Sequence, residues 1–183
     1  VDEGGVVMLH VRLSERPGGE VAVNIRRTEG DSDICPGTAV RFGAEVDGNY
    51  DTVETFDVAL YDQDTPKTVA NFLNYLRDGD YSGTIVHRSI PGFVIQGGGY
   101  RSGAEGIEPV PQDDPVENEP VRSNKRGTIA MAKLPGDPDS ATSEWYVNLA
   151  DNSSELDGQN GGFTAFGQVF PDSMATVDQI ASL

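Results

Sequence analysis

The residues of this sequence best suited to chemistry lie at positions 86–99, in the run VHRSIPGFVIQGGG. Arg88 carries a permanent charge on a planar fork of hydrogen-bond donors, and Gln96 carries an amide that both donates and accepts. Phe93 adds an apolar ring between them in the sequence. If the chain turns between them, Arg88 and Gln96 can converge on one shallow surface beside Phe93, where a cation, an amide and an apolar ring would meet a ligand together.

A β-hairpin must position these side chains. Alternation along a strand puts Arg88 on one face and His87 on the other, and we expect a structural role for His87. Residues 91–92 are Pro-Gly and predict a turn, after which Gln96 comes back toward Arg88 beside Phe93. The alternative is an ordinary hairpin that ends in a glycine bulge and has no chemical role.

The composition limits the possible functions. A chain of 183 residues suits one domain with a sizeable core. The formal net charge of −17 repels phosphate backbones, so we expect no nucleic-acid partner, and no apolar run is long enough to span a membrane. Cys35 is the one cysteine, which excludes an internal disulfide framework. The chain starts at Val1 without a signal-peptide pattern, which indicates a processed or trimmed piece.

Residues 1–36 are predicted to form an N-terminal β-hairpin extension. Alternating apolar residues at 6–13 and 20–26 indicate two strands, with a Pro-Gly-Gly turn between them. Because two strands alone are marginally stable in water, this hairpin must pack on another part of the molecule.

The pattern from residue 37 onward predicts a β-rich domain with two helices. Strands are expected at 39–46 and 52–61, joined through an Asp-Gly-Asn turn, and later at 126–133. The helices are expected at 66–77, where apolar residues recur at helical spacing after a capping Thr and a Pro, and at 173–181. Residues 100–122 are predicted to be a surface loop. The segment that starts at Asp78 resembles a calcium loop, but Ser89 replaces its twelfth-position Glu, so no metal is expected.

Several ordered motifs resemble those of the cyclophilins. Residues 86–98 are similar to the family's central motif F-H-R-V-I-P-G-F-M-I-Q-G-G, and residues 67–72 match its helix motif K-T-V-A-N-F. Further similarities are to R-G-x-x-x-M-A, S-Q-F-F-I, L-D and V-F-G-x-V, in family order. The resemblance covers residues 37–183 and implies a mainly β fold, a closed eight-stranded antiparallel barrel capped by two helices.

One departure concerns the closing edge of this barrel. Cyclophilins continue after their second helix into a last strand beside the first, whereas this chain stops at Leu183. Either the protein continues beyond Leu183, or the 1–36 hairpin occupies that edge.

The resemblance implies peptidyl-prolyl cis-trans isomerisation in protein folding. Rotation about a peptide bond faces a barrier of about 18–20 kcal/mol, because the nitrogen lone pair is delocalised into the carbonyl. A guanidinium that donates more strongly to the localised lone pair of the twisted amide stabilises the transition state selectively. Such a mechanism needs no cofactor.

The resemblance also assigns roles to individual residues. Arg88, Gln96 and Phe93 match the catalytic positions, with Arg88 as the donor to the amide nitrogen. The substrate-binding positions are Val94, Ala132, Lys133, Glu144, Tyr146, Leu156 and Phe163, of which Ala132 and Lys133 match residues whose backbone pairs with the peptide.

The chain departs from the family at several of these positions. Val94 replaces a Met, and Tyr146 replaces a Phe, which is tolerable if its hydroxyl finds a partner. Glu144 replaces a Gln and adds an anion that could favour basic peptides. Glu155 stands where eukaryotic members have a Trp that binds cyclosporin, so we expect weak or no cyclosporin binding. Lys133 and Phe163 replace the Asn and His of the eukaryotic forms. Basic and aromatic residues at these two positions are typical of bacterial members.

Two functions remain open at this stage. The first is an active isomerase of bacterial type that acts on proline-containing peptides and unfolded proteins. The second is a catalytically weak cyclophilin-like module for peptide binding or adhesion. We expect a monomer located outside the cytoplasm, periplasmic or secreted, with a cytoplasmic location as the alternative.

Overall fold

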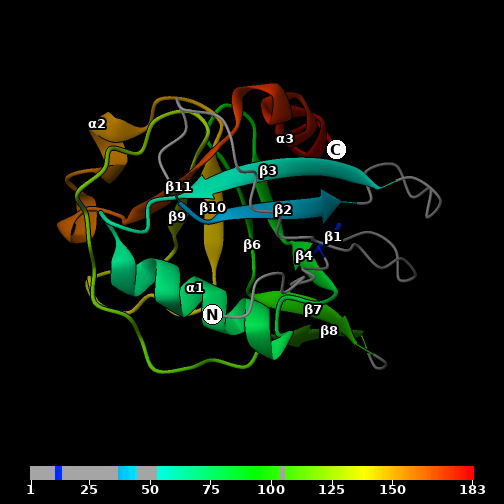
Figure 1. The fold of residues 1–183 in the computed structure, drawn as a ribbon, viewed down its shortest axis with the longest axis horizontal. Coiled ribbons are helices and arrows are strands. Elements are labelled where there is room, and N and C mark those ends of the chain that lie inside the picture. The colour runs from blue at the N-terminus through cyan, green and yellow to red at the C-terminus, as the bar shows by residue number, and fades with distance from the viewer. Residues whose placement is uncertain (1–10, 14–36, 45–52, 104–105) are drawn as a thin grey trace.

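The structure is a computed structural model, and it is described for residues 11–13, 37–44, 53–103 and 106–183 (Figure 1). Most of the predicted N-terminal hairpin, Cys35 and the predicted turn at 47–49 lie outside these residues. The described part is mainly β, as the sequence predicted.

All described strands belong to one sheet. Its order is β5-β6-β10-β9-β11-β3-β2-β1-β4-β7-β8. The strands are β1 (Val11–Leu13), β2 (Ala39–Ala44), β3 (Glu54–Leu60), β4 (Thr84–Val86), β5 (Arg88–Ile90), β6 (Val94–Gly97), β7 (Tyr100–Gly103), β8 (Gly106–Pro109), β9 (Thr128–Met131), β10 (Trp145–Asn148) and β11 (Ala165–Val169).

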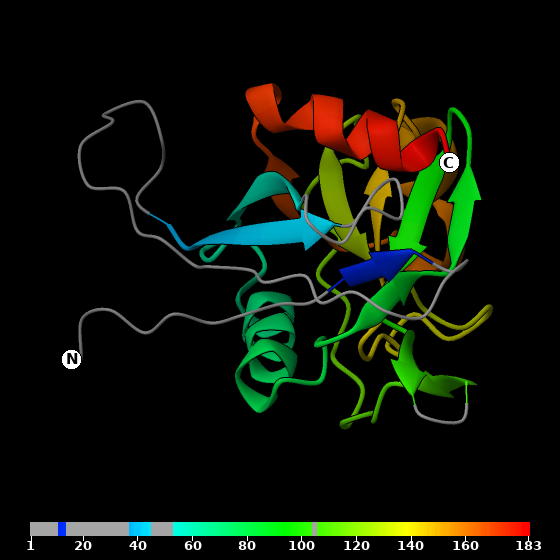
Figure 2. The same cartoon turned by 90° about the vertical axis from the view of Figure 1, so that its right-hand side faces the viewer.

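The sheet is antiparallel except around β1, which runs parallel to both β2 and β4. β1, which comes from the N-terminal segment, lies between β2 and β4, while the rest of the predicted hairpin lies outside the described residues. β4 and β5 lie far apart in the strand order although only His87 separates them in the chain. The sheet must curl strongly to connect them, and Figures 1 and 2 show this curl.

Two longer helices lie on opposite sides of the curled sheet, α1 (Pro66–Asp78) and α3 (Met174–Ala181) (Figures 1 and 2). Both predicted helices are confirmed. α1 begins at its proline, buries one apolar face that includes Val69 and Phe72, and ends at Gly79, whose φ of 77° suits a glycine. Shorter helical segments are α2 (Ser153–Leu156), η1 (Gln159–Gly161) and η2 (Pro171–Ser173).

The predicted surface loop at 100–122 is wrong in its first part, because β7 and β8 form a hairpin there. This hairpin continues the sheet from β4 through the pairing of Thr84 with Arg101. Tyr100 and Ile107 are exposed, so the hairpin lacks the buried apolar face that strand prediction depends on. Backbone pairing joins it to the sheet, and such pairing leaves no pattern in the side chains.

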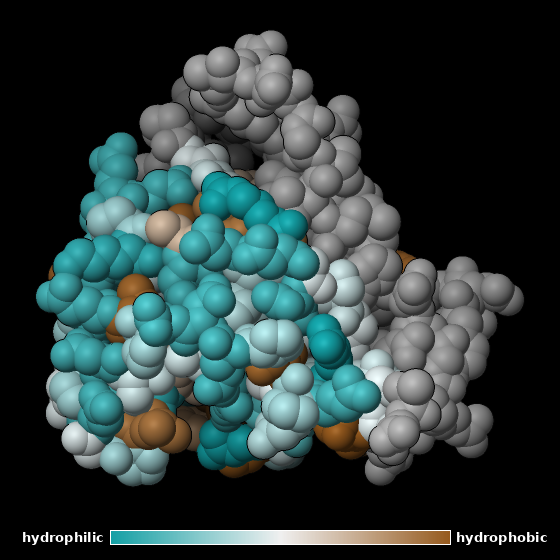
Figure 3. Space-filling view, turned by 90° about the horizontal axis from the view of Figure 1, so that it is seen from below, coloured by the Kyte–Doolittle hydropathy of each residue, from teal (hydrophilic) through white to brown (hydrophobic). Residues whose placement is uncertain are grey.

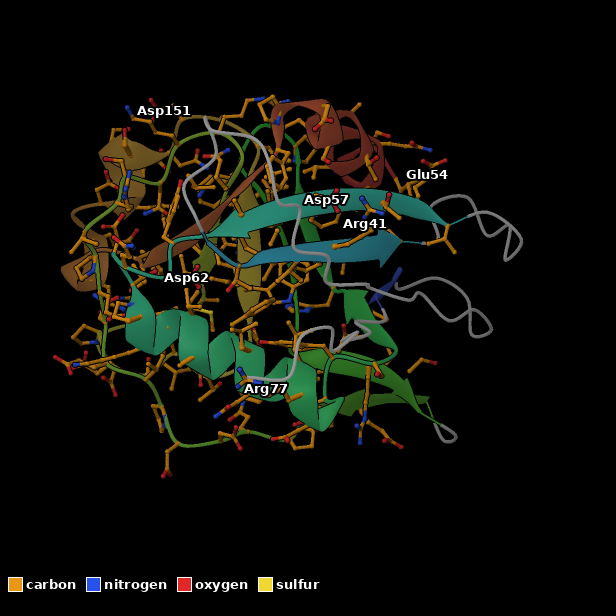
Figure 4. The ribbon with its side chains drawn as sticks, viewed as in Figure 1. Arg41, Glu54, Asp57, Asp62, Arg77 and Asp151 are labelled. Carbon is orange, nitrogen blue, oxygen red and sulfur yellow. The ribbon has the colours of Figure 1, made fainter. Side chains whose placement is uncertain are left out.

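Figure 3 shows hydrophilic residues over most of the coloured part of one face, with apolar side chains scattered among them. Arg41 of β2 and Asp57 of β3 lie opposite each other and form a paired contact of 2.7 Å (Figure 4). An exposed pair of this kind contributes at most about 1 kcal/mol.

Alternation along β6, β9 and β10 divides the apolar side chains into two clusters. Ile95, Ile129, Trp145 and Val147 enter the main core. Their chain neighbours face a second, smaller cluster, which consists of Val94, Ala130, Tyr146, Leu156 and Ala165, with Phe93, Ala132 and Phe163 packed against it. The main core is aromatic, with the Phe42 ring stacked on Phe56 and edge-on to Trp145 at 5.2 Å.

Gly97 and Gly98 let β6 approach Trp145. A Cβ at Gly98 would lie 2.7 Å from both the Ser143 carbonyl oxygen and the Trp145 ring, and the φ of Gly98 is 79°. We therefore predict that Gly98→Ala lowers the free energy of unfolding by about 2–5 kcal/mol, since overpacking adds to the cost of a left-handed residue.

Gly136→Ala is the matched control for this prediction. Gly136 has a φ of 80° but nothing within 4 Å of an added Cβ, so only the backbone cost of about 1–2 kcal/mol should appear. Urea unfolding of the two variants measures both losses. Equal losses would show that the contact with Trp145 is not what requires a glycine at position 98.

Candidate active site

The hairpin of β5 and β6 brings Arg88 and Gln96 together. The two residues are paired across the strands, and Arg88 Nη1 donates to Gln96 Oε1 at 2.9 Å. The turn closes with Phe93 N donating to Ile90 O, and Gly92 has a φ of 72° that a left-handed turn position requires. The proximity expected from the Pro-Gly turn is therefore present.

Phe93 completes this group. Its ring centroid lies 5.9 Å from Arg88 Cζ, close enough for a weak cation–π interaction. Its carbonyl oxygen accepts hydrogen bonds from Leu149 N and from Asn152 Nδ2, at 2.8 and 2.9 Å. Because the segment after β10 anchors its backbone, the partly exposed ring is held beside the guanidinium.

The second apolar cluster adjoins these residues. It contains six of the residues to which the resemblance assigned a catalytic or substrate-binding role, namely Phe93, Val94, Ala132, Tyr146, Leu156 and Phe163. Tyr146 and Phe163 meet edge to face with centroids 6.1 Å apart. Phe93 and Phe163 are only partly buried, so the cluster presents apolar surface to a ligand. Ala132 N donates to Glu144 O within the protein, at 2.9 Å.

Tyr146 is compatible with this apolar surface because its hydroxyl has a partner. The hydroxyl donates to Asn124 Oδ1 at 2.8 Å, which meets the condition set by the sequence analysis. Burial raises the pKa of Tyr146 far above its ordinary value, so the group remains a neutral donor.

Asn124 is an organising residue that sequence reasoning missed. It is fully buried, and its Nδ2 donates to Asp157 Oδ1 and to the Phe163 carbonyl oxygen, both at 3.0 Å. It therefore joins Tyr146 to the segment that carries Phe163. Nothing in the polar run before β9 distinguishes this asparagine from its neighbours.

The Lys133 side chain does not point into the apolar surface as a free cation. Its Nζ donates to the carbonyl oxygens of Asn160, Gly162 and Pro138, and it lies 4.9 Å from the centre of the Phe163 ring. Burial lowers the pKa of Lys133, although nearby aspartates oppose this. Lys133 thus links two loops and supports the Phe163 ring.

Glu144 connects the remaining polar groups. Its Oε2 accepts from Gln96 Nε2 at 2.6 Å and lies 3.6 Å from His87 Nε2. The contact with His87 lowers the pKa of Glu144 most, burial opposes it, and the Gln96 bond lowers it further. Sequence analysis placed His87 on the face away from Arg88, yet the structure links the two through Glu144 and Gln96, because His87 lies at the break between β4 and β5.

The described residues offer no other obvious chemistry at this site. Among them, no group of three His, Cys, Asp or Glu side chains is arranged to hold a metal ion. No helix in the described ranges is long and apolar enough to cross a membrane.

Comparison with known proteins identifies the family. Residues 45–183 match the family described as cyclophilin type peptidyl-prolyl cis-trans isomerase/CLD. The chain belongs to this family. The resemblance found in the sequence motifs is therefore confirmed.

Bacterial relatives are similar over most of the chain. Peptidyl-prolyl cis-trans isomerase A of Dickeya dadantii is 42% identical over 130 residues, which cover 69% of this chain and 66% of the relative. Isomerase B of Escherichia coli is 40% identical over 129 residues, 67% of this chain and 76% of the relative. The match thus spans just under two thirds of the length of the Dickeya protein.

A solved structure supports the fold. The cyclophilin type isomerase of Cryptosporidium parvum, crystallised in the presence of the dipeptide Ala-Pro, superposes with a TM-score of 0.54 at 25% identity. The superposition covers 69% of this chain and 78% of the other.

We predict that Tyr146→Phe lowers the free energy of unfolding by about 0.5–1.5 kcal/mol, the usual cost of one lost hydrogen bond. The loss stays small because Asn124 Oδ1 keeps a contact with Asn148 Nδ2 at 3.3 Å. Tyr100→Phe is the control, since Tyr100 is exposed and its variant should unfold like the unmutated protein. A Tyr146→Phe variant as stable as this control would contradict the role given to the hydroxyl.

Proposed function

We propose that this chain catalyses cis-trans isomerisation of Xaa-Pro peptide bonds. The observation that carries the proposal is the Arg88–Gln96 hydrogen bond beside Phe93, at the margin of the second apolar cluster. Membership of the cyclophilin family and the names of its bacterial relatives support it.

In the proposed mechanism the apolar cluster holds the proline ring. Phe93, Phe163 and Tyr146 offer an apolar aromatic surface on which the proline ring can be buried. Burial there restricts the motion of the proline ring and leaves the Xaa–Pro amide free to rotate. Rotation then takes place about the Xaa–Pro bond, whose two planar isomers are close in free energy. No covalent bond to the protein forms.

Arg88 acts on the twisted amide. As the bond rotates, the proline nitrogen regains a localised lone pair, which accepts a hydrogen bond more strongly than the planar amide nitrogen does. The guanidinium presents a planar fork of donors, and the bond to Gln96 limits its rotation. Donation therefore favours the transition state over either planar isomer.

We propose proline-containing peptides and unfolded chains as substrates. The Cryptosporidium structure supports this, because that cyclophilin was crystallised in the presence of Ala-Pro. The partly exposed rings of Phe93 and Phe163 are consistent with binding an extended chain across the surface.

We also propose that the curled sheet is a closed barrel of eight strands, antiparallel except where β1 pairs with its two neighbours. If β4 and β5 count as one strand interrupted at His87, the paired order β5-β6-β10-β9-β11-β3-β2-β1-β4 returns to its starting strand. The eighth strand is then β1, which comes from the N-terminal segment. The β7–β8 hairpin would lie outside this ring.

The mechanism predicts that Arg88→Ala lowers kcat/KM by two to three powers of ten, about 3–4 kcal/mol of barrier. Peptide affinity should change far less, because the apolar cluster remains. Arg88→Lys should also have a much lower kcat/KM than the unmutated protein, since an ammonium lacks the planar fork of donors. Magnetisation transfer on a short Xaa-Pro peptide measures exchange, and titration of the same peptide measures affinity.

Arg77→Ala is the control for this prediction, because Arg77 is exposed in the last turn of α1 (Figure 4), a helix that contributes none of the site residues. Its exchange rate should equal that of the unmutated protein. Near-normal exchange by Arg88→Ala would contradict the role of Arg88. Peptide binding by the unmutated protein without any acceleration would instead favour a binding module.

Cyclosporin should bind weakly. Glu155 is exposed on α2 at the position where the resemblance implies an indole contact with the drug. Loss of one such contact is worth about 1–3 kcal/mol, and Glu155→Trp should therefore tighten binding by roughly ten- to a hundredfold. Calorimetry with both proteins measures the change. Nanomolar binding by the unmutated protein would contradict the prediction.

A further inference from the structure

Glu144 contacts both sides of the proposed site. It lies immediately before β10, and its carbonyl oxygen accepts from Ala132 N at 2.9 Å. Its carboxylate accepts from Gln96 Nε2 at 2.6 Å, while the other end of the Gln96 amide accepts from Arg88 Nη1 at 2.9 Å. The three side chains therefore form a line from Glu144 through Gln96 to Arg88.

The chemistry of the two end groups allows only one orientation of the amide between them. A carboxylate has no proton to donate, and a guanidinium has no acceptor. If the Gln96 amide turned over, its oxygen would face the carboxylate and its NH2 group would face the guanidinium. Both contacts would then be repulsive, so Glu144 and Arg88 together hold Gln96 with its oxygen toward Arg88.

The surroundings of Glu144 favour a fixed carboxylate. A Cβ at Gly99 would lie 2.5 Å from Glu144 Oε1, so the glycine leaves the space that the carboxylate occupies. The His87 ring is half-buried and packs edge-on against Tyr100. Its Nε2 contacts Glu144 Oε2, the same oxygen that accepts from Gln96. The lowered pKa of Glu144 is consistent with a group that stays ionised near neutral pH.

We propose that Glu144 is a positioning residue that acts through Gln96 to hold the Arg88 guanidinium in its donating orientation. This inference deepens the proposed isomerase function and rests on it. The cyclophilin motif has Gln where this chain has Glu144, and an amide at that position can donate as well as accept, so it selects the Gln96 orientation less strictly.

The kinetic test compares Glu144→Ala, Glu144→Gln, Gln96→Ala and the double variant Gln96→Ala/Glu144→Ala. Glu144→Ala should lower kcat about tenfold and change KM by less than twofold. Glu144→Gln keeps an acceptor, so its kcat should stay within about threefold of that of the unmutated protein. The double variant should be no slower than Gln96→Ala alone, because Glu144 acts only through Gln96. Glu108→Gln removes one negative charge from the neighbouring hairpin and should leave kcat unchanged.

A spectroscopic test does not depend on catalysis. In the unmutated protein, nitrogen-15 NMR should show distinct Nη resonances for Arg88 and a dispersed pair of amide protons for Gln96. In Glu144→Ala, faster motion of the two side chains should average the Arg88 Nη resonances and narrow the separation of the Gln96 amide protons. Glu108→Gln should leave both sets of resonances unchanged. If the unmutated protein is not an isomerase, the proposed function fails, but these spectra still decide whether Glu144 orders Gln96 and Arg88.

Three outcomes would overturn the inference. The first is a double variant whose losses add, which would mean that Glu144 acts independently of Gln96. The second is a Glu144→Ala variant whose KM rises only for lysine-containing peptides at unchanged kcat, which would make Glu144 a charge-selecting contact. The third is an unchanged Arg88 and Gln96 spectrum in folded Glu144→Ala.

Discussion

The alternation of side chains along β6, β9 and β10 is the constraint on which the rest of the structure depends. Trp145 packs into the main core while its neighbour Tyr146 faces the second cluster, and Ile95 and Val94 divide in the same way. A slip of one residue in register would exchange the two faces. The large aromatic core therefore sets the register of the strands, and the register sets which side chains a ligand meets.

Close packing against Trp145 also fixes the position of the polar groups of the site. Gly97 and Gly98 bring the end of β6 against the indole, and β6 carries Gln96 just before them. Gln96 pairs with Arg88 on one strand and with Tyr146 on the other. The guanidinium is thus exposed, but the backbone that presents it is tied to the most buried part of the molecule.

The site also shows how a strongly acidic protein uses its few cations. Lys133 is engaged by three carbonyl oxygens and supports the Phe163 ring, rather than projecting toward a ligand. Arg88 keeps one hydrogen bond to Gln96 and remains exposed. Because an exposed guanidinium on a long side chain has many conformations, its orientation depends on the groups that hold Gln96.

The sequence alone determined the mainly β class, the helix at 66–77 and the meeting of Arg88, Phe93 and Gln96, because local periodicity and turn chemistry decide each of them. Its ordered motifs, through their resemblance to the cyclophilins, also indicated the family. Tertiary structure alone decided the rest. Asn124 joins Tyr146 to the Phe163 segment, and Glu144 joins His87 to Gln96. These contacts connect residues more than twenty positions apart, and the exposed β7–β8 hairpin is held by backbone pairing, so neither leaves a local pattern to read.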